Sequence, residues 1–353
     1  PEQRVAPQNL PRAPEAVWHV GQKGAGVLPL RDRLAAIGFP AQAGDPALYD
    51  AALSDAVAAY QRAAGLRDDG VAGPQTIRLL NGDVPTVQGA RQRAILVAME
   101  RLRWMGTQDL GQRYVWVNIP EYSTAIIENG QEVFRTRSVV GKDGEHMRTP
   151  EFSDLMSNIV VNPSWNVPRS ITTREYLPKL QANRNAVSHL DLVNSRGNVV
   201  SRDGIDFGKY TASNFPFRLR EKPSEDNALG VVKFIFPNQW NIYLHDTPSK
   251  HLFANSTRAY SHGCVRIGDP RDLARVLLSK QTDDPAGLFQ HTLDSGRETW
   301  LRLKPAVPVH LVYFTAWPDA SGTIRTFGDV YGRDARVWQA LQAQGVGQAA
   351  APS

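Results

Sequence analysis

Apolar residues recur at helical spacing in the first hundred residues of the chain. Two stretches, over residues 28–37 and 51–64, each place their apolar side chains on one face of a helix. Pro74 suits the first turn of a third helix. The apolar faces carry, in chain order, Leu30, Leu34, Ile37, Leu53, Val57, Tyr60, Ile77 and Leu80. This pattern predicts a small three-helix bundle over residues 26–85.

After residue 112 the apolar residues recur at every second position instead of at helical spacing. Val115, Val117 and Ile119 alternate with polar or aromatic neighbours, as in a strand with one buried face. Asn129-Gly130 is a strong signal for the turn of a hairpin. Further segments are strand-like at 159–161, 231–236, 242–244, 300–303 and 309–314, and helical at 270–279 and 284–296. We therefore predict a mostly β domain over residues 113–340.

The remaining segments complete a multidomain α+β organisation. Residues 163–230 are polar, aromatic and marked by prolines, and they are too many for a structureless loop inside a compact domain. We interpret them as an inserted capping subdomain or lid with a helix at 171–180. Residues 86–112 are predicted to form a linker with a scaffold helix, residues 1–25 an extended lead-in, and residues 341–353 a disordered tail.

Composition and charge narrow the class of protein. The 353 residues are 42% hydrophobic, enough for a substantial core, and no apolar run approaches the roughly 20 residues that span a bilayer. The net charge is +5, with the basic residues scattered, so the chain lacks the basic arm of a nucleic-acid-binding protein. Because the chain begins at Pro1 without an initiator Met, we interpret it as a processed or trimmed product, which is compatible with a removed signal or membrane anchor.

Cys264 is the only cysteine in the chain, so it cannot form an internal disulfide. Its neighbours in Ser261-His262-Gly263-Cys264-Val265-Arg266 are polar, basic or glycine, which is a poor wall for a buried apolar thiol. Nearby cations and free backbone N–H groups lower the pKa of a thiol and stabilise a developing oxyanion. We therefore predict a nucleophilic cysteine with a lowered thiol pKa.

Such a nucleophile needs a base. His245 ends the apolar segment 242–244 and precedes a turn, a position where a rigid strand exposes a side chain. His262 lies only two residues before Cys264 and is suited to line the pocket, and Gly263 lets the backbone approach an oxyanion closely. A satisfied polar histidine and an ion-paired Arg266 are the purely structural alternatives.

A zinc site is the other chemical interpretation of this region. Its possible ligands are His245, Asp246, His251, His262 and Cys264. Their spacing fits no common zinc pattern, and neither His-Glu-x-x-His nor Cys-x-x-Cys occurs in the chain. We predict neither a metal nor another cofactor.

The helical region resembles a known binding module. The run Ala56-Val57-x-x-Tyr60-Gln61-x-x-x-Gly65-Leu66-x-x-Asp69-Gly70-x-x-Gly73-Pro74-x-Thr76 is similar to the three-helix peptidoglycan-binding domain, over roughly residues 26–82. The glycines and the proline also specify the fold alone, because backbone geometry dictates such positions. The resemblance implies a ligand class, peptidoglycan glycan and stem peptides, and does not identify the contacting residues.

The cysteine motif resembles a catalytic family. Ser261-His262-Gly263-Cys264-Val265-Arg266, preceded by His245 at the spacing of that family, is similar to the signature of the YkuD-type L,D-transpeptidase domain, a mostly β sandwich. The resemblance implies that Cys264 attacks a peptide carbonyl with His245 as its base. It also implies that the N–H groups of Gly263 and Cys264 form the oxyanion hole, while His262 shapes the turn.

Three more segments extend this resemblance to the large periplasmic branch of the family, which carries both a capping subdomain and a peptidoglycan-binding domain. These segments are residues 162–168, 211–218 and 242–248. Many smaller family members have Asn where this chain has Arg266, so Arg266 is a candidate for binding a substrate carboxylate. Tyr243, Ser261 and Trp165 are candidates for the pocket wall, with core packing as the alternative for Tyr243 and Trp165.

The sequence therefore predicts a periplasmic acyltransferase of the cell wall. A Cys264 thioester with a donor stem tetrapeptide would form with release of the terminal D-residue, and an acceptor amine would resolve it into a cross-link. Carbapenem-type inhibitors are expected to acylate Cys264. The alternatives are an L,D-carboxypeptidase or endopeptidase that uses the same site with water, and a non-catalytic peptidoglycan-binding protein with a degenerate second domain.

Overall fold

The computed structural model describes residues 9–42, 44–64, 66, 68–83, 87–106, 109–319 and 321–346. They form two compact units. The first contains the described residues up to Trp104, together with Ala316–Thr326 and those from Asp334 onward. The second contains Met105–Thr315 and Phe327–Arg333. Within the described residues, no helix combines the length and the apolar character needed to cross a bilayer.

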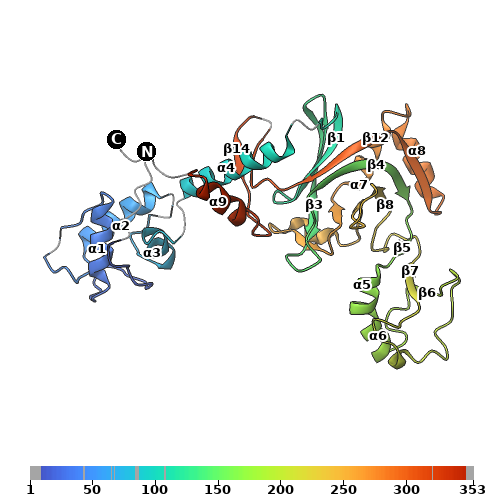
Figure 1. The fold of residues 1–353 in the computed structure, drawn as a ribbon, viewed down its shortest axis with the longest axis horizontal. Helices are drawn as coiled ribbons and strands as arrows, with labels where there is room; N and C mark the ends of the chain where they lie inside the picture. The colour runs from blue at the N-terminus through green and yellow to red at the C-terminus, as the bar shows by residue number, and fades with distance from the viewer. Residues whose placement is uncertain are drawn as a thin grey trace. The chain divides into compact units, whose positions relative to one another are not determined.

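Three helices of the first unit form the predicted bundle (Figure 1). They are α1 (Val27–Ala36), α2 (Ala51–Ala63) and α3 (Pro74–Leu80). Asp50 caps α2 by accepting a hydrogen bond from the backbone N–H of Leu53 (2.9 Å), and Pro74 begins α3. The predicted apolar faces meet in one core, whose fully buried side chains include Leu30, Leu34, Tyr49, Leu53, Val57, Ile77 and Leu80. The three-helix prediction is confirmed.

The described part of the lead-in belongs to this bundle. Trp18 forms an antiparallel bridge with Ala72, and Lys23 forms one with Leu48. These backbone bonds tie the segment before α1 to the two loops that follow it. Residues 1–8 of the predicted lead-in lie outside the described part of the chain.

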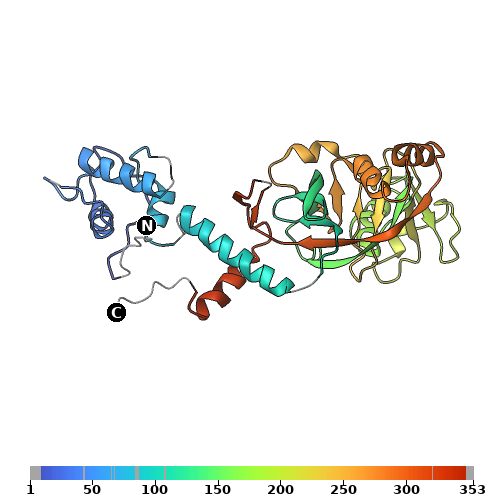
Figure 2. The same ribbon diagram turned by 90° about the horizontal axis from the view of Figure 1, so that it is seen from above.

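Two further helices of this unit pack on each other, as Figure 2 shows. They are α4 (Val87–Met105) and α9 (Asp334–Ala343). Buried Arg101 of α4 pairs with Asp334 at 3.3 Å, and Arg93 lies over the ring of Trp338. The helix predicted within residues 86–112 is present, whereas α9 was not predicted and includes the start of the segment expected to be a disordered tail. Residues 347–353 of that tail lie outside the described residues.

The second unit is built on one mixed β-sheet. In its described residues the strand order is β10-β3-β11-β9-β8-β4-β12-β1-β2, and β2 also pairs with β3, so the sheet closes on itself. The strands are β1 (Arg113–Asn118), β2 (Ser123–Glu128), β3 (Gln131–Gly141), β4 (Phe152–Val161), β8 (Val232–Ile235), β9 (Leu244–His245), β10 (Ala259–Ser261), β11 (Val265–Ile267) and β12 (Thr299–Val312). The predicted mostly β domain is confirmed.

The core of this unit lies between the sheet and two helices, α7 (Pro270–Leu278) and α8 (Pro285–Asp294). Helices were predicted at both places, and each begins with proline at its first position. Leu273 of α7 and Phe289 of α8 are completely buried against the sheet. The core strands contribute Val115, Val117, Ile126, Ile159, Phe234, Leu244, Val265 and Val309, among others.

One predicted pair of strands is a single element. The segments 300–303 and 309–314 belong to β12, which pairs with β4 on both sides of a register shift between Arg302 and Val307. Proline has no N–H to donate to a ladder, and a bulge is where a sheet accommodates it. Pro305 lies inside this irregular stretch, so the prediction of two separate strands was wrong.

The insert, residues 163–230, is a subdomain that we call the cap. Its three strands have the order β5-β7-β6 and are joined by short helices. The elements are β5 (Trp165–Asn166), α5 (Arg169–Ile171), the π-helix η1 (Thr172–Tyr176), α6 (Leu177–Ala182), β6 (Leu190–Val193), the 3₁₀-helix η2 (Phe207–Lys209) and β7 (Arg218–Glu221). The cap has its own apolar core, which includes Leu177, Leu180, Leu192, Phe215 and Leu219.

Gly230, at the end of the cap, provides a test of this junction. Its φ is +57°, and a Cβ there would lie 2.3 Å from Cγ of Asp246. We expect Gly230→Ala to lower the free energy of unfolding by about 1–2 kcal/mol through left-handed strain, and by about 1–3 kcal/mol more through overpacking.

Gly204→Ala is the matched control, because φ is +74° in the same cap but a Cβ added there would have no atom within 4 Å. Denaturant unfolding followed by fluorescence measures both variants. Equal destabilisation of the two would show that Asp246 does not restrict this junction.

Candidate active site

Two short parallel strands bring the predicted nucleophile and base into one place. Leu244 of β9 pairs with Val265 of β11, and His245 pairs with Arg266. Cys264 directly precedes β11, so residues 19 positions apart in the sequence line the same pocket, which has a volume of about 400 Å³. This volume is within the range of small-ligand sites.

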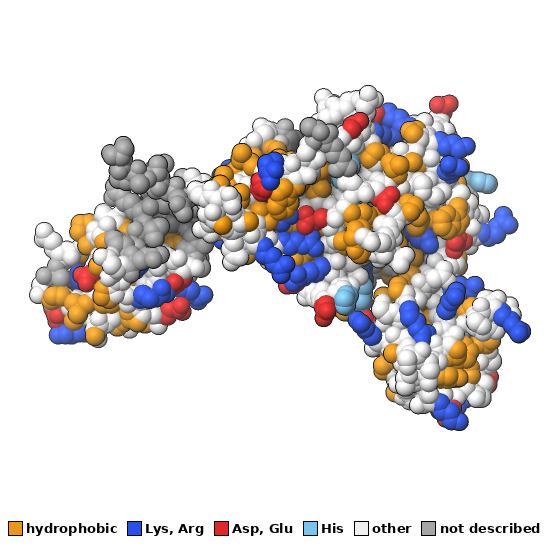
Figure 3. All heavy atoms as spheres, viewed as in Figure 1, with side chains coloured by type: hydrophobic (Ala, Val, Ile, Leu, Met, Phe, Trp, Pro, Cys, Tyr) orange, Lys and Arg blue, Asp and Glu red, His pale blue; other side chains and the backbone are white. Residues whose placement is uncertain are grey.

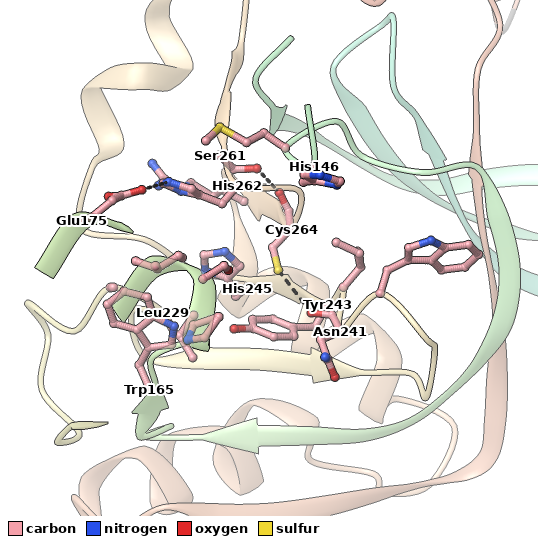
Figure 4. A pocket seen from close by; sticks show the side chains of 18 of the residues that line it. His146, Trp165, Glu175, Leu229, Asn241, Tyr243, His245, Ser261, His262 and Cys264 are labelled. Carbon is pink, nitrogen blue, oxygen red and sulfur yellow. Dashed lines mark hydrogen bonds and ion pairs between the residues drawn. The ribbon is translucent and has the colours of Figure 1, made fainter. Parts of the chain in front are cut away.

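Figure 4 shows how the two parts of the second unit line this pocket. Cys264 and His245 lie within the catalytic domain, while Trp165 and Glu175 project from the cap. All the predicted site residues except Gly263 line the pocket. They are Trp165, Tyr243, His245, Ser261, His262, Cys264 and Arg266.

Cys264 is half-buried at the base of the pocket. Its thiol donates to the backbone carbonyl of Asn241 at 3.7 Å, and Asn241 has a positive φ of 53°. Burial raises the pKa of the Cys264 thiol to about 11, although hydrogen bonds from Tyr243 and the charge of Arg266 act in the opposite direction. The predicted low thiol pKa is therefore wrong for this state, because desolvation of the thiolate outweighs the nearby cation.

His245 is buried and held in one orientation. Its Nδ1 donates to the backbone carbonyl of Asp246, so the neutral ring presents the lone pair of Nε2. Burial, and then the charge of Arg266, lower the pKa of His245 to about 3. The ring also packs edge-on against Tyr243, with centroids 5.6 Å apart. The resting pair is therefore a neutral thiol and a neutral imidazole.

Asp246 binds His245 through its backbone carbonyl, and its own side chain is held in place by several contacts. Its carboxylate accepts the backbone N–H groups of Val231 (3.0 Å) and Thr247 (2.7 Å) and pairs with Lys250. The chain returns from the cap at Val231. Asp246 therefore contacts both the end of the cap and, through its backbone carbonyl, His245. No cluster of three or more His, Cys, Asp or Glu side chains suited to a metal ion occurs among the described residues.

Ser261 organises the turn before the nucleophile. The Gly263 N–H donates to Ser261 Oγ at 3.1 Å, and Oγ donates to the Cys264 carbonyl at 2.5 Å. Gly263 has a φ of +117°, and its carbonyl accepts a bond from Thr149 Oγ1 at 2.8 Å. The hydroxyl of Ser261 is thus used inside the turn, and the Gly263 N–H is engaged. In the described part of the chain, the Cys264 N–H has no partner and can face an oxyanion.

Arg266 lines the pocket and forms no ion pair with another residue in the described part of the chain. Its Nε is buried and has no hydrogen-bond partner among the described residues. Burial lowers its pKa, and the nearest opposing influence is Cys264. A guanidinium nitrogen buried without a hydrogen-bond partner is costly, so the site favours an anionic ligand group beside Arg266.

Several contacts at the site were not predicted. Asn241 accepts from the thiol, Thr149 holds the catalytic turn, and Asp246 orients His245. Glu175 of η1 accepts a hydrogen bond from His262 Nε2 at 2.6 Å. Asn241 was detectable as a residue that tolerates positive φ before an apolar segment. Nothing in the sequence around Glu175, inside a predicted helix, indicated its partner.

Comparisons with known proteins agree with this geometry. A family model described as the L,D-transpeptidase catalytic domain (YkuD) matches residues 112–290, and one described as a putative peptidoglycan-binding domain matches residues 23–80. A relative from Haemophilus influenzae, named putative L,D-transpeptidase, is 34% identical over 266 residues, which are 74% of this chain and 53% of that protein. The chain thus spans about half the length of this relative.

Solved structures of L,D-transpeptidases also match at low similarity. One from Xylanimonas cellulosilytica is 17% identical, with 86% of this chain and 98% of that chain covered and a TM-score of 0.20. One from Mycobacterium smegmatis is 11% identical, with 57% and 58% covered and a TM-score of 0.24. One from E. faecium, acylated by ertapenem, is 11% identical, with 58% and 100% covered and a TM-score of 0.28.

The family assignment rests on the catalytic-domain model rather than on these structures. That model covers about half of the chain and includes the cap, the base-bearing strand and the cysteine motif. By this match the chain belongs to the L,D-transpeptidase (YkuD) family.

Proposed function

We propose that the chain is a peptidoglycan L,D-transpeptidase that cross-links stem peptides through a Cys264 thioester. The observation that carries the proposal is the presence of Cys264, His245 and the unpaired Arg266 at one pocket, beneath a cap, in a chain of this family. The donor is a stem tetrapeptide, and its terminal D-residue is the leaving group.

Acylation begins from the neutral pair. His245 Nε2 takes the thiol proton as Sγ attacks the carbonyl carbon of the L,D amide, since Nδ1 is already committed to Asp246. The oxyanion faces the Cys264 N–H, with Gly263 as the second predicted donor after a small rotation of Ser261. Collapse breaks the C–N bond, and His245 returns the proton to the leaving amine. Arg266 holds a carboxylate of the donor, and Tyr243 and Trp165 form the wall.

Resolution follows the reverse path. The acceptor amine attacks the thioester carbon, the new C–N bond forms as the C–S bond breaks, and His245 carries the surplus proton away. Leu229 and Trp165 contribute apolar side chains to the cap side of the pocket, and such surface disfavours water as the competing nucleophile. In the same proposal His262 shapes the turn and does not act as the base for Cys264.

The proposed partners and location follow from the two family matches. Residues 26–85 would bind peptidoglycan glycan and stem peptides, and residues 86–112 would link this domain to the next. The catalytic domain would be residues 113–340, with the cap at 163–230. Residues 341–353 would form a tail. The match of a peptidoglycan-binding model to residues 23–80 supports this division. We place the protein in the periplasm. Carbapenem-type inhibitors would acylate Cys264.

Product analysis separates this function from its alternatives. Purified disaccharide-tetrapeptide is incubated with the full chain, and the products are identified by mass spectrometry and fragmentation. Cross-linked dimers support a transpeptidase. Tripeptide without dimers would instead identify an L,D-carboxypeptidase, and unchanged tetrapeptide a non-catalytic binding protein.

The roles of the cysteine and the two histidines predict different acylation behaviour. Cys264→Ala should show no mass increase with a carbapenem, because the nucleophile is absent. His245→Ala should slow acylation about 10²- to 10⁴-fold, the usual contribution of a general base. His262→Ala should still become acylated. Intact-protein mass spectrometry over time measures all three, and acylation of Cys264→Ala would overturn the assignment of the nucleophile.

The raised thiol pKa predicts the pH dependence of labelling. Below a pKa of about 11 the thiolate fraction of Cys264 should rise about tenfold per pH unit. Alkylation by iodoacetamide should therefore accelerate continuously from pH 6 to pH 9, and the single cysteine makes the signal specific.

The same protein unfolded in urea is the control for this titration, since its exposed thiol should approach a plateau above its ordinary pKa of about 8.5. A plateau of the folded protein above pH 6 would instead reveal a thiolate already formed beside a protonated His245.

A further inference from the structure

The pocket wall contributed by the cap carries charges that the proposed acylation does not use. Arg174, Glu175 and Tyr176 are consecutive residues, and all three line the pocket. An α-helix rotates consecutive residues by about 100° each, whereas η1 is a π-helical turn, whose i→i+5 hydrogen bonds rotate consecutive residues by a smaller angle. Such turns are frequent at functional sites.

The π-helical turn is fixed to the cap rather than loose. The Thr172 side chain is buried and donates to the Val167 carbonyl at 3.4 Å, and Thr173 donates to the Arg169 carbonyl at 2.9 Å. Leu177, which follows the turn, is buried in the apolar core of the cap. The turn therefore presents its polar side chains to the pocket from a rigid support.

Glu175 is the acidic group of this wall. The carboxylates among the pocket-lining residues belong to Glu145 and Glu175. The Glu145 side chain is 89% exposed and lies 3.4 Å from His146, whereas that of Glu175 is 40% exposed and lies 2.6 Å from Nε2 of His262 in the catalytic motif. Figure 4 shows the Glu175 carboxylate directed at His262. On the visible face of the cap, Lys and Arg are more prominent than acidic side chains (Figure 3).

The Glu175–His262 contact is easily exchanged. Ion pairs between partly exposed side chains contribute little net free energy, because water screens them and both side chains lose freedom. The second carboxylate oxygen of Glu175 has no partner among the described residues. A ligand cation entering the pocket can therefore bind Glu175 beside His262, or replace His262 as its partner.

We infer that Glu175 is the residue that recognises the acceptor, by binding the ammonium group of the amine that resolves the Cys264 thioester. This inference rests on the proposed transpeptidase function. The acceptor arrives as R–NH₃⁺ and must become R–NH₂ before it attacks. Overall, R–NH₃⁺ and the thioester yield the amide, the free thiol and one proton, which leaves through neutral His245. Water carries no charge for Glu175 to attract, so the carboxylate favours amine over water.

The experiment measures how the acyl-enzyme divides between amine and water. Full-length wild type, Glu175→Gln and Glu145→Gln are incubated with purified disaccharide-tetrapeptide, and the ratio of dimer to tripeptide is measured by mass spectrometry. The amide oxygen introduced by Glu175→Gln can still accept the His262 N–H, so the substitution removes charge and keeps the contact. We expect the ratio to fall about fivefold in Glu175→Gln, and less so at high salt. Glu145→Gln should keep the wild-type ratio.

A neutral nucleophile separates charge recognition from a change in the cap. Hydroxylamine is uncharged at neutral pH and converts the thioester to a hydroxamate. Wild type and Glu175→Gln should give the same hydroxamate yield and the same rate of Cys264 acylation. An unchanged dimer ratio in Glu175→Gln, or an equal loss with hydroxylamine, would overturn the inference. If wild type forms no dimers, the proposed transpeptidase function fails instead.

Discussion

The parallel pairing of β9 with β11 is the constraint on which the rest of the site depends. These strands are only two and three residues long, yet their register decides that His245 and Cys264 share a pocket. So short a ladder is not stable alone, because its few hydrogen bonds do not offset the conformational entropy lost when residues 246–263 close the loop between the strands. It persists because β8 and β3 pair on its two sides within a closed sheet whose core includes Leu244 and Val265.

The same burial that fixes the pair also determines its charge state. Arg266 lies close enough to disfavour a protonated His245 and to favour a Cys264 thiolate, but desolvation is the larger influence on both groups. Hydration stabilises the neutral pair of Cys264 and His245 only weakly. In the proposed mechanism the pair becomes charged only as the substrate carbonyl is attacked. Donors already in place at that moment need not reorganise, which is the condition under which electrostatic stabilisation is most effective. The turn held by Ser261 and Thr149 meets this condition.

The sequence was most informative where the signal is local. Helical and two-residue periods located the bundle and most of the sheet, and the unusual setting of Cys264 led to its partner His245. The strands β9, β10 and β11 have at most three residues, too few for a period to be detected. The pKa of the Cys264 thiol was predicted in the wrong direction. Residues next to Cys264 in the sequence indicate the charges around the thiol, whereas its burial depends on segments that are distant in the sequence, such as the cap. For the same reason Glu175, 87 positions from His262, had no signature.

The distribution of charge over the pocket bears on how two substrates use one site. The unpaired cation Arg266 belongs to β11, next to the nucleophile, whereas the carboxylate of Glu175 belongs to the cap. If Arg266 on the sheet holds the donor and Glu175 on the cap attracts the acceptor, the two peptides contact different parts of the pocket: one wall belongs to the sheet and the other to the cap. Asp246 joins these two walls, since it orients His245 through its own carbonyl and binds the chain where the cap returns. In the proposed mechanism, a displacement of the cap would therefore change acceptor binding and the orientation of His245 together.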